Sequence, residues 1–391
     1  MGDHARSNVT LSAHLTRTQP HPPHTTSSWR DKLPIRTGYK YLDPLLIAVP
    51  VTITLHYFVA TPPLIMFSIA ALGIIPLAGA LGEATEELGA HLGERAGGLL
   101  NATMGNATEL IISFFALRAG HAELVKASLS GSIIGNILLV FGMSVVAGGL
   151  GRERQQFSRR HASINSTMLF IAVVALVIPA VFDLAVFGRL EEHGPRIEQL
   201  SLWTCIVLVI LYALNLLFTF GGGKSHSEGK PQGSAWRPAI GLLIATLLVG
   251  WLSEILVGEI EAAKRTLGMS ELFMGVIIIA IIGNAAEHAT AVIMAKRDKM
   301  ELALGIAIGS SIQIALLVAP VLVFLSWIIG DPMSLVFTPL EIAGIALAVF
   351  TVDMIASDGE TTWFEGVQLI AVYLILAVAF YFVPASGTRL P

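Results

Sequence analysis

Apolar runs of about 20 residues recur from Leu45 almost to the C-terminus, separated by short charged or Gly/Pro/Ser-rich breaks. A helix of about 20 apolar residues is long enough to cross the ~30 Å hydrocarbon core of a bilayer. A soluble protein cannot bury so many such runs, and only 13% of the 391 residues are charged, against about 25% in soluble globular proteins. The sequence therefore predicts an all-α integral membrane protein that crosses the bilayer many times.

The breaks between the runs predict about eleven transmembrane helices. They are expected to begin near Asp43, Pro63, Gly98, Leu124, Ile164, Leu200, Arg237, Ser270, Glu301, Pro339 and Trp363. Residues 1–42 are polar, rich in His and Pro, and lack the apolar core of a secretory signal, so they predict a disordered cytoplasmic tail. With that tail inside, 17 of the 24 Lys and Arg residues fall on inner segments, which favours an inner N-terminus and an outer C-terminus.

A glycine-rich polar segment at 221–236 is the only long polar stretch within the predicted membrane region. It leaves five predicted helices on each side after the first one. We therefore interpret it as a cytoplasmic linker between two halves, residues 62–220 and 237–384, which follow an extra N-terminal transmembrane helix at 43–61.

A short motif occurs twice. Gly-Asn-Ala-Thr-Glu, beginning at Gly105, returns as Gly-Asn-Ala-Ala-Glu beginning at Gly283, an offset of 178 residues. The match continues without a gap, so that Gly131-Ser132 aligns with Gly309-Ser310. Apolar composition alone would not align Gly, Asn, Ser and Glu, which indicates internal duplication. Because each half has five helices, the second copy must cross the membrane in the opposite sense. Such an inverted repeat is typical of secondary transporters, whose site lies near the membrane midplane.

Glu109 and Glu287 close the two motifs, and each lies deep within an apolar run. A carboxylate at that depth costs on the order of 3 kcal/mol or more unless it faces a polar cavity or a partner. A structural Glu bonded to nearby backbone is the alternative, but the symmetric placement favours a functional pair. We expect both to bind a cation and to transfer protons.

Neutral oxygen donors accompany each carboxylate. Asn106 and Asn284 precede the glutamates by three residues, so each is expected on the same helix face as its glutamate. A second helix of each half adds Ser132 and Asn136, or Ser310 and Gln313. Carboxylate, amide and hydroxyl oxygens without sulfur suit a hard cation, Ca2+ above all. Taken singly, the Ser and Asn residues would serve equally well as contacts between helices.

Other features of the sequence carry less weight. Glu341 and Glu365 follow Thr338 and Thr362 in the spacing of a capping box, which predicts a structural role. Acids near Glu83 and Glu261 could raise the cation concentration at the entrances, although solvated helix ends explain them as well. The single cysteine permits no intrachain disulfide, and no cofactor is expected. A net charge of −4 without a basic, aromatic stretch argues against a nucleic-acid partner.

The paired motifs resemble those of the Ca2+/H+ antiporters of the cation/Ca2+ exchanger superfamily. The resemblance extends from about Asp43 to Val383. It implies ten core helices in two inverted repeats plus one extra helix, with Glu109 and Glu287 binding Ca2+ or protons in turn. It also implies a multi-pass protein of the inner (plasma) membrane if the source is bacterial; a homo-oligomer is possible. Gly135 stands where related sequences often have Ser, which thins the polar lining beside Asn136.

Ion exchange by alternating access is the preferred function. Ca2+ requires deprotonated carboxylates, so Ca2+ and H+ compete for one site and must alternate. A Na+/Ca2+ exchanger, or an exchanger of another divalent cation for H+, is the alternative. Sodium-coupled relatives typically place a further acid on the helix that here contains Gln313. An intramembrane enzyme with two catalytic carboxylates is also considered, but there is no His-Glu-x-x-His pattern, and Gly330-Asp331 lacks the first glycine of a Gly-x-Gly-Asp motif. We therefore predict a transporter and not an enzyme.

Overall fold

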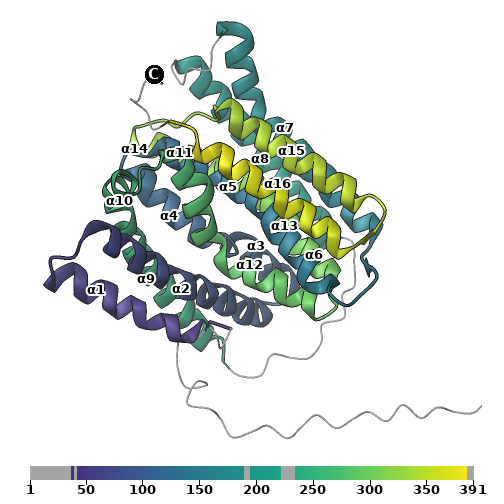
Figure 1. Ribbon diagram of the computed structural model, residues 1–391, viewed down its shortest axis with the longest axis horizontal. Coiled ribbons are helices and arrows are strands. Elements are labelled where there is room, and N and C mark those ends of the chain that lie inside the picture. The colour runs from purple at the N-terminus through teal and green to yellow at the C-terminus, as the bar shows by residue number, and fades with distance from the viewer. Residues whose placement is uncertain (1–36, 39–41, 189–193, 222–233, 385–391) are drawn as a thin grey trace, which may run out of the picture. The chain divides into compact units, whose positions relative to one another are not determined.

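A computed structural model describes residues 37–38, 42–188, 194–221 and 234–384. All structural statements concern these residues, which lie within the unit formed by residues 34–391. Nearly all of the predicted tail, and the predicted linker from 222 to 233, fall outside the described residues. The regular secondary structure of the described residues is helical apart from two short strands, β1 (Gln155–Gln156) and β2 (Glu360–Thr361). The prediction of an all-α protein is confirmed (Figure 1).

Most helices begin within five residues of the predicted positions. The first part of the chain contains η2 (Asp43–Ile47), α1 (Ala48–Phe58), α2 (Pro63–Leu92), α3 (Glu94–Met104), α4 (Ala107–Arg118), α5 (Ala122–Ile134), the π-helical η3 (Gly135–Val140), α6 (Phe141–Gly149), α7 (Arg159–Phe187) and α8 (Pro195–Gly221). The second part contains α9 (Trp236–Gly258), α10 (Ile260–Leu267), α11 (Glu271–Phe273), the π-helical η4 (Met274–Ile279), α12 (Ala280–Lys296), α13 (Met300–Gln313), the π-helical η5 (Ile314–Val318), α14 (Ala319–Ile329), α15 (Pro339–Ala356) and α16 (Trp363–Tyr381).

Eight helical stretches among the described residues are long and apolar enough to cross a membrane. A ninth arises if α10 and the helix beginning at Glu271, which are bent by 112° relative to each other, form one span. The chain is thus a multi-pass membrane protein. The helix at 43–58 is shorter, and α3 and α4 are each too short to span alone, so the number eleven stays a prediction.

Local side-chain caps explain why two of the helices start where they do. Thr338 is the N-cap of α15 and Thr362 is the N-cap of α16, and in each case the carboxylate of the Glu three residues later accepts a hydrogen bond from the backbone N–H of the threonine. These are complete capping boxes, which satisfy N–H groups that a helix start leaves without partners. The structural role predicted for Glu341 and Glu365 is confirmed.

The apolar run in which a helix is predicted to begin near Gly98 forms two helices with a break between them. α3 ends at Met104 and α4 begins at Ala107, with Gly105 and Asn106 in the turn between them. Asn106 is the N-cap residue of α4 and precedes the helix that contains Glu109, so the common helix face expected for the two residues stays a prediction. Glycine weakens a helix by about 1 kcal/mol, and the side chain of Asn106 is bound by another helix, as described below. The counterpart α12 continues unbroken through Gly283.

Two long helices are built alike. α5 begins at residue 122 and α13 at 300, the π-helical turns begin at 135 and 314, and α6 and α14 begin at 141 and 319. These boundaries repeat at the offset of the sequence motif, to within one residue. π-Helical turns are frequent at functional sites, and here η3 contains Asn136 while η5 directly follows Gln313.

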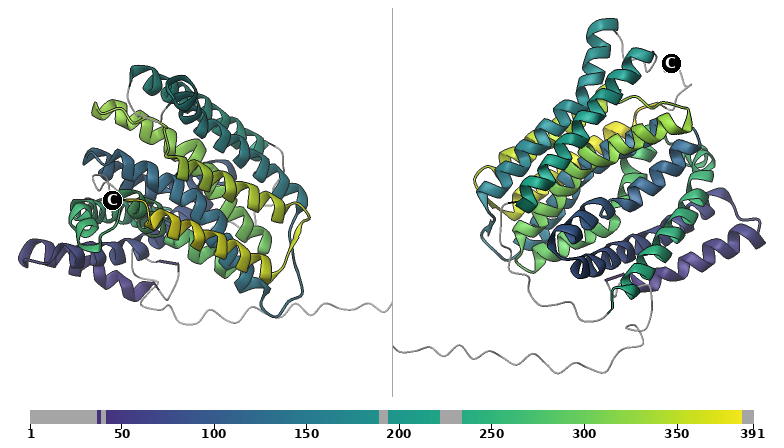
Figure 2. Two further views of the ribbon diagram at one scale, coloured as in Figure 1. Left: turned by 45° about the horizontal axis from the view of Figure 1, so that its top comes forward. Right: turned by 180° about the vertical axis from the view of Figure 1, so that it is seen from behind.

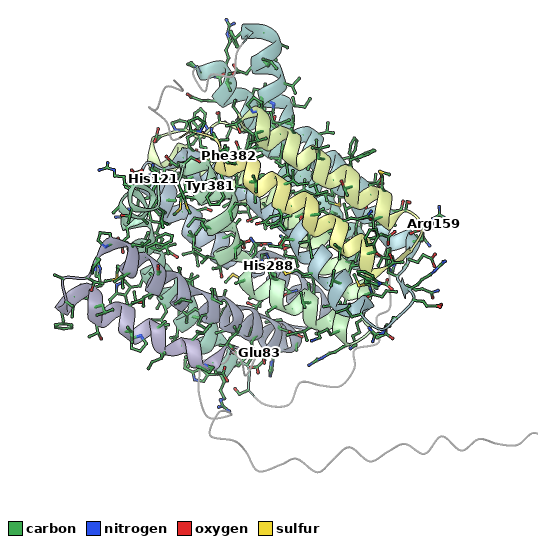
Figure 3. The ribbon with its side chains drawn as sticks, viewed as in Figure 1. Glu83, His121, Arg159, His288, Tyr381 and Phe382 are labelled. Atoms are coloured by element: carbon green, nitrogen blue, oxygen red, sulfur yellow. The ribbon has the colours of Figure 1, made fainter. Side chains whose placement is uncertain are left out.

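The helices connect at two ends, which we name after residues labelled in Figure 3. The His121 end contains the α4–α5 turn and the bend between α10 and α11. The Arg159 end contains the antiparallel pair of β1 and β2 and the ion pair of Arg154 with Glu360. Basic residues on segments at the Arg159 end are Arg152, Arg154, Arg159, Arg160, Lys296, Arg297 and Lys299. Elsewhere α2 packs along α9 and α1 (Figures 1 and 2).

At the His121 end α5 lies directly against η4, and we call this contact the closed seam. A Cβ atom added to Gly131 would lie 2.2 Å from the carbonyl oxygen of Val276, and one added to Gly275 would lie 2.4 Å from Cβ of Ala127. The residues 178 positions beyond Gly131 and Ala127 are Gly309 and Gly305. No described atom lies within 4 Å of a Cβ added to either of them. Equivalent positions of the two halves are therefore packed differently.

Candidate ion-binding site

The two motifs meet face to face. Glu109 lies in the first turn of α4, and Glu287 lies in the middle of α12, which packs against α4. A Cβ added to Gly283 would lie 2.7 Å from Cγ of Glu109, and one added to Gly105 would lie 3.9 Å from Oε1 of Glu287. The glycine of each motif thus faces the carboxylate of the other. Glycine is required at position 283 because any side chain there would displace Glu109.

Asn106 binds the second half of the chain through both ends of its amide. Its Nδ2 donates to Oε1 of Gln313 at 2.6 Å, and Oγ of Ser310 donates to its Oδ1 at 3.0 Å. Both partners lie on α13. These contacts hold the turn between α3 and α4 at the site, which explains why Asn106 is drawn out of the helix.

Asn136 and Asn284 extend the same network toward α5. Nδ2 of Asn136 donates to Oγ of Ser310 at 3.0 Å and to Oδ1 of Asn284 at 3.3 Å. Nδ2 of Asn284 in turn donates to Oγ of Ser132 at 2.8 Å. The structure thus brings all six predicted neutral residues into one chain of hydrogen bonds beside the two glutamates.

Burial differs between the two carboxylates. The side chains of Asn106, Asn136 and Asn284 are each 1% exposed and Glu109 is 8% exposed, whereas Glu287 is partly exposed. Even so, Oε1 of Glu109 and Oε2 of Glu287 are buried atoms without a hydrogen-bond partner. An unpartnered carboxylate oxygen is costly in a low-dielectric interior. A cation or a proton would remove that cost, so the site fits either ion.

A second buried polar cluster, absent from the predicted site, lies toward the His121 end. Lys126 is 2% exposed and donates from Nζ to the carbonyl oxygen of Val336 at 3.0 Å. Ser130 donates to Oε1 of Glu341 at 2.8 Å, so Glu341 joins α5 to α15 as well as capping its helix. The repeat could not reveal Lys126, because its counterpart at the 178-residue offset is Leu304.

The sequence matches the sodium/calcium exchanger protein family over residues 62–221 and 237–382. The chain belongs to this family. It is 43% identical over 371 residues to a Ca2+/H+ antiporter of Synechocystis sp., covering 89% of this chain and 99% of the relative. It is also 43% identical over 331 residues to the Ca2+/H+ antiporter ChaA of Bacillus subtilis, covering 82% of this chain and 93% of the relative.

Solved structures agree with this assignment. The structure of native YfkE superposes with a TM-score of 0.77 at 42% identity, covering 88% of this chain and 100% of that chain. The H+/Ca2+ exchanger CAX has a TM-score of 0.66 at 15% identity over 88% of this chain and 92% of that chain, which shows the shared fold. The resemblance to Ca2+/H+ antiporters that the paired motifs indicate is confirmed.

Proposed function

We propose that this family member exchanges Ca2+ for H+ across a membrane by alternating access, with Glu109 and Glu287 binding Ca2+ or protons in turn. The observation that carries the proposal is the meeting of two carboxylates, each with an unpartnered buried oxygen, beside six hydrogen-bonded neutral residues. The Ca2+/H+ antiporters to which the chain is similar support the same pair of ions.

Charge balance explains the coupling. Two ionised carboxylates carry two negative charges, which one Ca2+ or two protons neutralise. Ca2+ coordination needs both groups deprotonated, so Ca2+ and protons exclude each other. The other groups of the hydrogen-bonded network, including Gln313, are uncharged. Several Na+ ions would call for more anionic ligands than this set contains, which favours protons over the Na+-coupled alternative.

The layout of two inverted five-helix repeats belongs to the same proposal, with eleven crossings and halves at 62–220 and 237–384. The family match in two blocks on either side of 222–236 supports it. So does the agreement between the boundaries of α5–η3–α6 and α13–η5–α14. The cluster of basic residues supports an inner Arg159 end and an outer His121 end.

The different packing of the two halves indicates which conformation of the transport cycle the structure represents. The closed seam of α5 with η4 lies toward the outer end, whereas Gly305 and Gly309 on α13 face open space and are partly exposed. Glu287 is also partly exposed. We interpret this conformation as inward-facing. In the opposite state the two halves would exchange roles, so that α13 closes at Gly309 and the seam at Gly131 opens.

Transport by the purified protein in sealed vesicles tests the proposal. Vesicles loaded with Ca2+, with the membrane potential clamped, should release Ca2+ when an inward proton gradient is imposed, because protons displace Ca2+ from the shared site. An inward Na+ gradient at equal pH on both sides should release none. Ca2+ efflux that is driven by the Na+ gradient and is unaffected by the pH gradient would reject proton coupling and support the Na+/Ca2+ alternative.

The proposed topology predicts opposite labelling of two exposed basic positions, Arg265 near the His121 end and Lys296 at the Arg159 end. On a Cys205→Ser background, Arg265→Cys should react with a membrane-impermeant maleimide added to intact cells. Lys296→Cys should react only after the membrane is permeabilised. Equal labelling of both positions in intact cells would contradict the inverted five-plus-five arrangement.

A further inference from the structure

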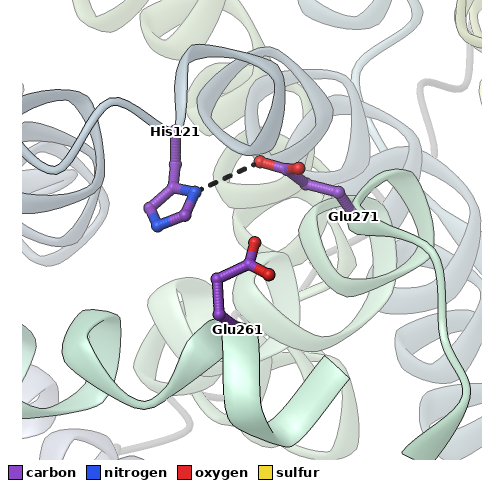
Figure 4. Close-up of side chains that lie close together, drawn as sticks. All are labelled: His121, Glu261 and Glu271. Carbon is purple, nitrogen blue, oxygen red and sulfur yellow. Dashed lines mark ion pairs between the residues drawn. The ribbon is translucent and has the colours of Figure 1, made fainter. Parts of the chain in front are cut away.

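Four side chains from the two halves meet at the His121 end, and none of them belongs to either motif. His121 stands in the turn between α4 and α5, held by a hydrogen bond from its backbone N–H to the carbonyl oxygen of Ala116 at 2.9 Å. Glu261 and Lys264 lie on α10, and Glu271 is the first residue of α11. Figure 4 shows His121, Glu261 and Glu271 converging across the gap between these elements.

Ion pairs connect all four side chains. Nδ1 of His121 lies 3.4 Å from Oε1 of Glu271. Nζ of Lys264 lies 2.5 Å from Oε1 of Glu261 and 3.4 Å from Oε2 of Glu271. His121 and Lys264 are each 18% exposed, Glu271 is 24% exposed and Glu261 is 43% exposed, so the cluster is partly shielded from solvent. The ammonium group of Lys264 already binds both carboxylates, which makes the cluster an ion-pair network and not a place for a metal ion.

The position of this network relates it to the closed seam. His121 immediately precedes α5, which supplies Gly131 and Ala127 to the seam, and Glu271 lies three residues before η4, which supplies Gly275 and Val276. A bond between His121 and Glu271 therefore joins the outer ends of the two elements that the seam brings together. Opening the seam would separate them.

We propose that His121, Glu261, Lys264 and Glu271 form a proton-operated clasp that holds the seam between α5 and η4 closed while His121 is protonated. The clasp depends on the proposed function in one respect: the seam is the outer gate only if the protein is an exchanger. The structural claim, that protonation of His121 ties the α4–α5 turn to the α10–α11 bend, stands on the ion pairs themselves.

Electrostatics gives the direction of the switch. When His121 is protonated, the positive charges of His121 and Lys264 balance the negative charges of the two glutamates. When His121 loses its proton, the cluster has a net charge of −1. The hydrogen bond to Glu271 raises the pKa of His121 above its ordinary value. The charged groups that act on it are Glu271, Glu261 and Lys264, while Glu123 on α5 is paired with Lys126. A raised pKa means that the contact stabilises the closed seam at low pH and is lost as pH rises through that pKa.

Hydrogen–deuterium exchange of the segment 259–274 in detergent-solubilised protein tests the clasp, after correction for the intrinsic pH dependence of exchange. The wild-type segment should exchange about fivefold faster at about pH 9 than at about pH 6, the size expected for a partly exposed charge pair. In the His121→Gln variant the segment should exchange at the fast rate at both pH values, and in the His121→Arg variant it should exchange at the slow rate at both. His161→Gln is the matched control, because His161 pairs with Glu301 at 2.7 Å at the opposite end, and it should behave as wild type.

Two results would overturn the clasp: a wild-type segment whose corrected exchange is the same at both pH values, or a His121→Arg variant that exchanges as fast as His121→Gln. Neither result depends on ion transport. If the protein did not transport Ca2+ against H+ but the expected hydrogen–deuterium exchange rates were observed, the proposed function would be rejected and the clasp would be retained.

Discussion

Replacement of either glutamate of the site by glutamine is expected to abolish Ca2+/H+ exchange and to leave the protein folded. Glu109→Gln or Glu287→Gln keeps the shape of the side chain and removes the group that takes up the proton. The remaining single carboxylate can balance only half the charge of Ca2+. We expect proton-driven Ca2+ efflux from vesicles to fall below about a tenth of wild type, because both charges are needed in a site of low dielectric.

Glu365→Gln is the matched control. Glu365 lies in the first turn of α16 and accepts a hydrogen bond from the backbone N–H of Thr362 at 2.7 Å, a role that glutamine also performs in a capping box. This variant should transport normally. Exchange above a tenth of wild type in a well-folded Glu109→Gln or Glu287→Gln protein would remove that carboxylate from the shared site.

Replacing either of two glycines at equivalent positions by alanine should shift the balance between the two conformations, in opposite directions. In Gly131→Ala the new Cβ would meet the carbonyl oxygen of Val276 at 2.2 Å, so the closed seam must part. Overpacking of this kind costs about 1–3 kcal/mol, or roughly 5- to 150-fold in the balance between two conformations. Gly131→Ala should therefore favour the outward-facing state. Gly309→Ala meets no described atom within 4 Å and should favour the state described here.

Two cysteine reporters, one in the closed seam and one at the open position on α13, measure this balance. On a Cys205→Ser background, Ala127→Cys is buried in the closed seam and Gly305→Cys is open. Gly131→Ala should increase the labelling of Ala127→Cys from outside, and Gly309→Ala should not. Gel filtration of each variant shows whether the protein is folded. If both alanine variants changed the two reporters in the same direction, the halves would not exchange roles during transport.

Local signals in the sequence predicted the positions of the helices well. Pro63 and Pro339 mark helix starts, and the Thr-x-x-Glu spacings at 338 and 362 form the expected caps. The repeat pointed to six of the eight residues proposed for the site without information about packing, namely Glu109, Glu287, Asn106, Asn284, Ser132 and Ser310. Two copies of one motif that must face each other leave few other arrangements for their polar side chains.

Features that depend on distant partners were not predictable. The break at Gly105 and Asn106 depends on Gln313, 207 residues away, which binds Asn106 at 2.6 Å. The motif at Gly283 has the same local sequence pattern and stays helical. The ion pairs of His121 likewise have no periodicity or motif that would bring a turn of one half to a bend of the other.

The broken helix has a consequence for how the chain enters the bilayer during synthesis. α3 and α4 contain 11 and 12 residues and include the polar Asn101 and Glu109, with Asn106 in the turn between them, so neither is a good substrate for insertion on its own. α2 is a strongly apolar 30-residue helix that immediately precedes them. Gly97 of α3 packs so closely on Gly89 of α2 that an added Cβ would lie 2.2 Å from the carbonyl oxygen of Gly89. The translocon is therefore expected to release these segments into lipid as a preassembled hairpin, in which α2 carries the binding-site helix with it.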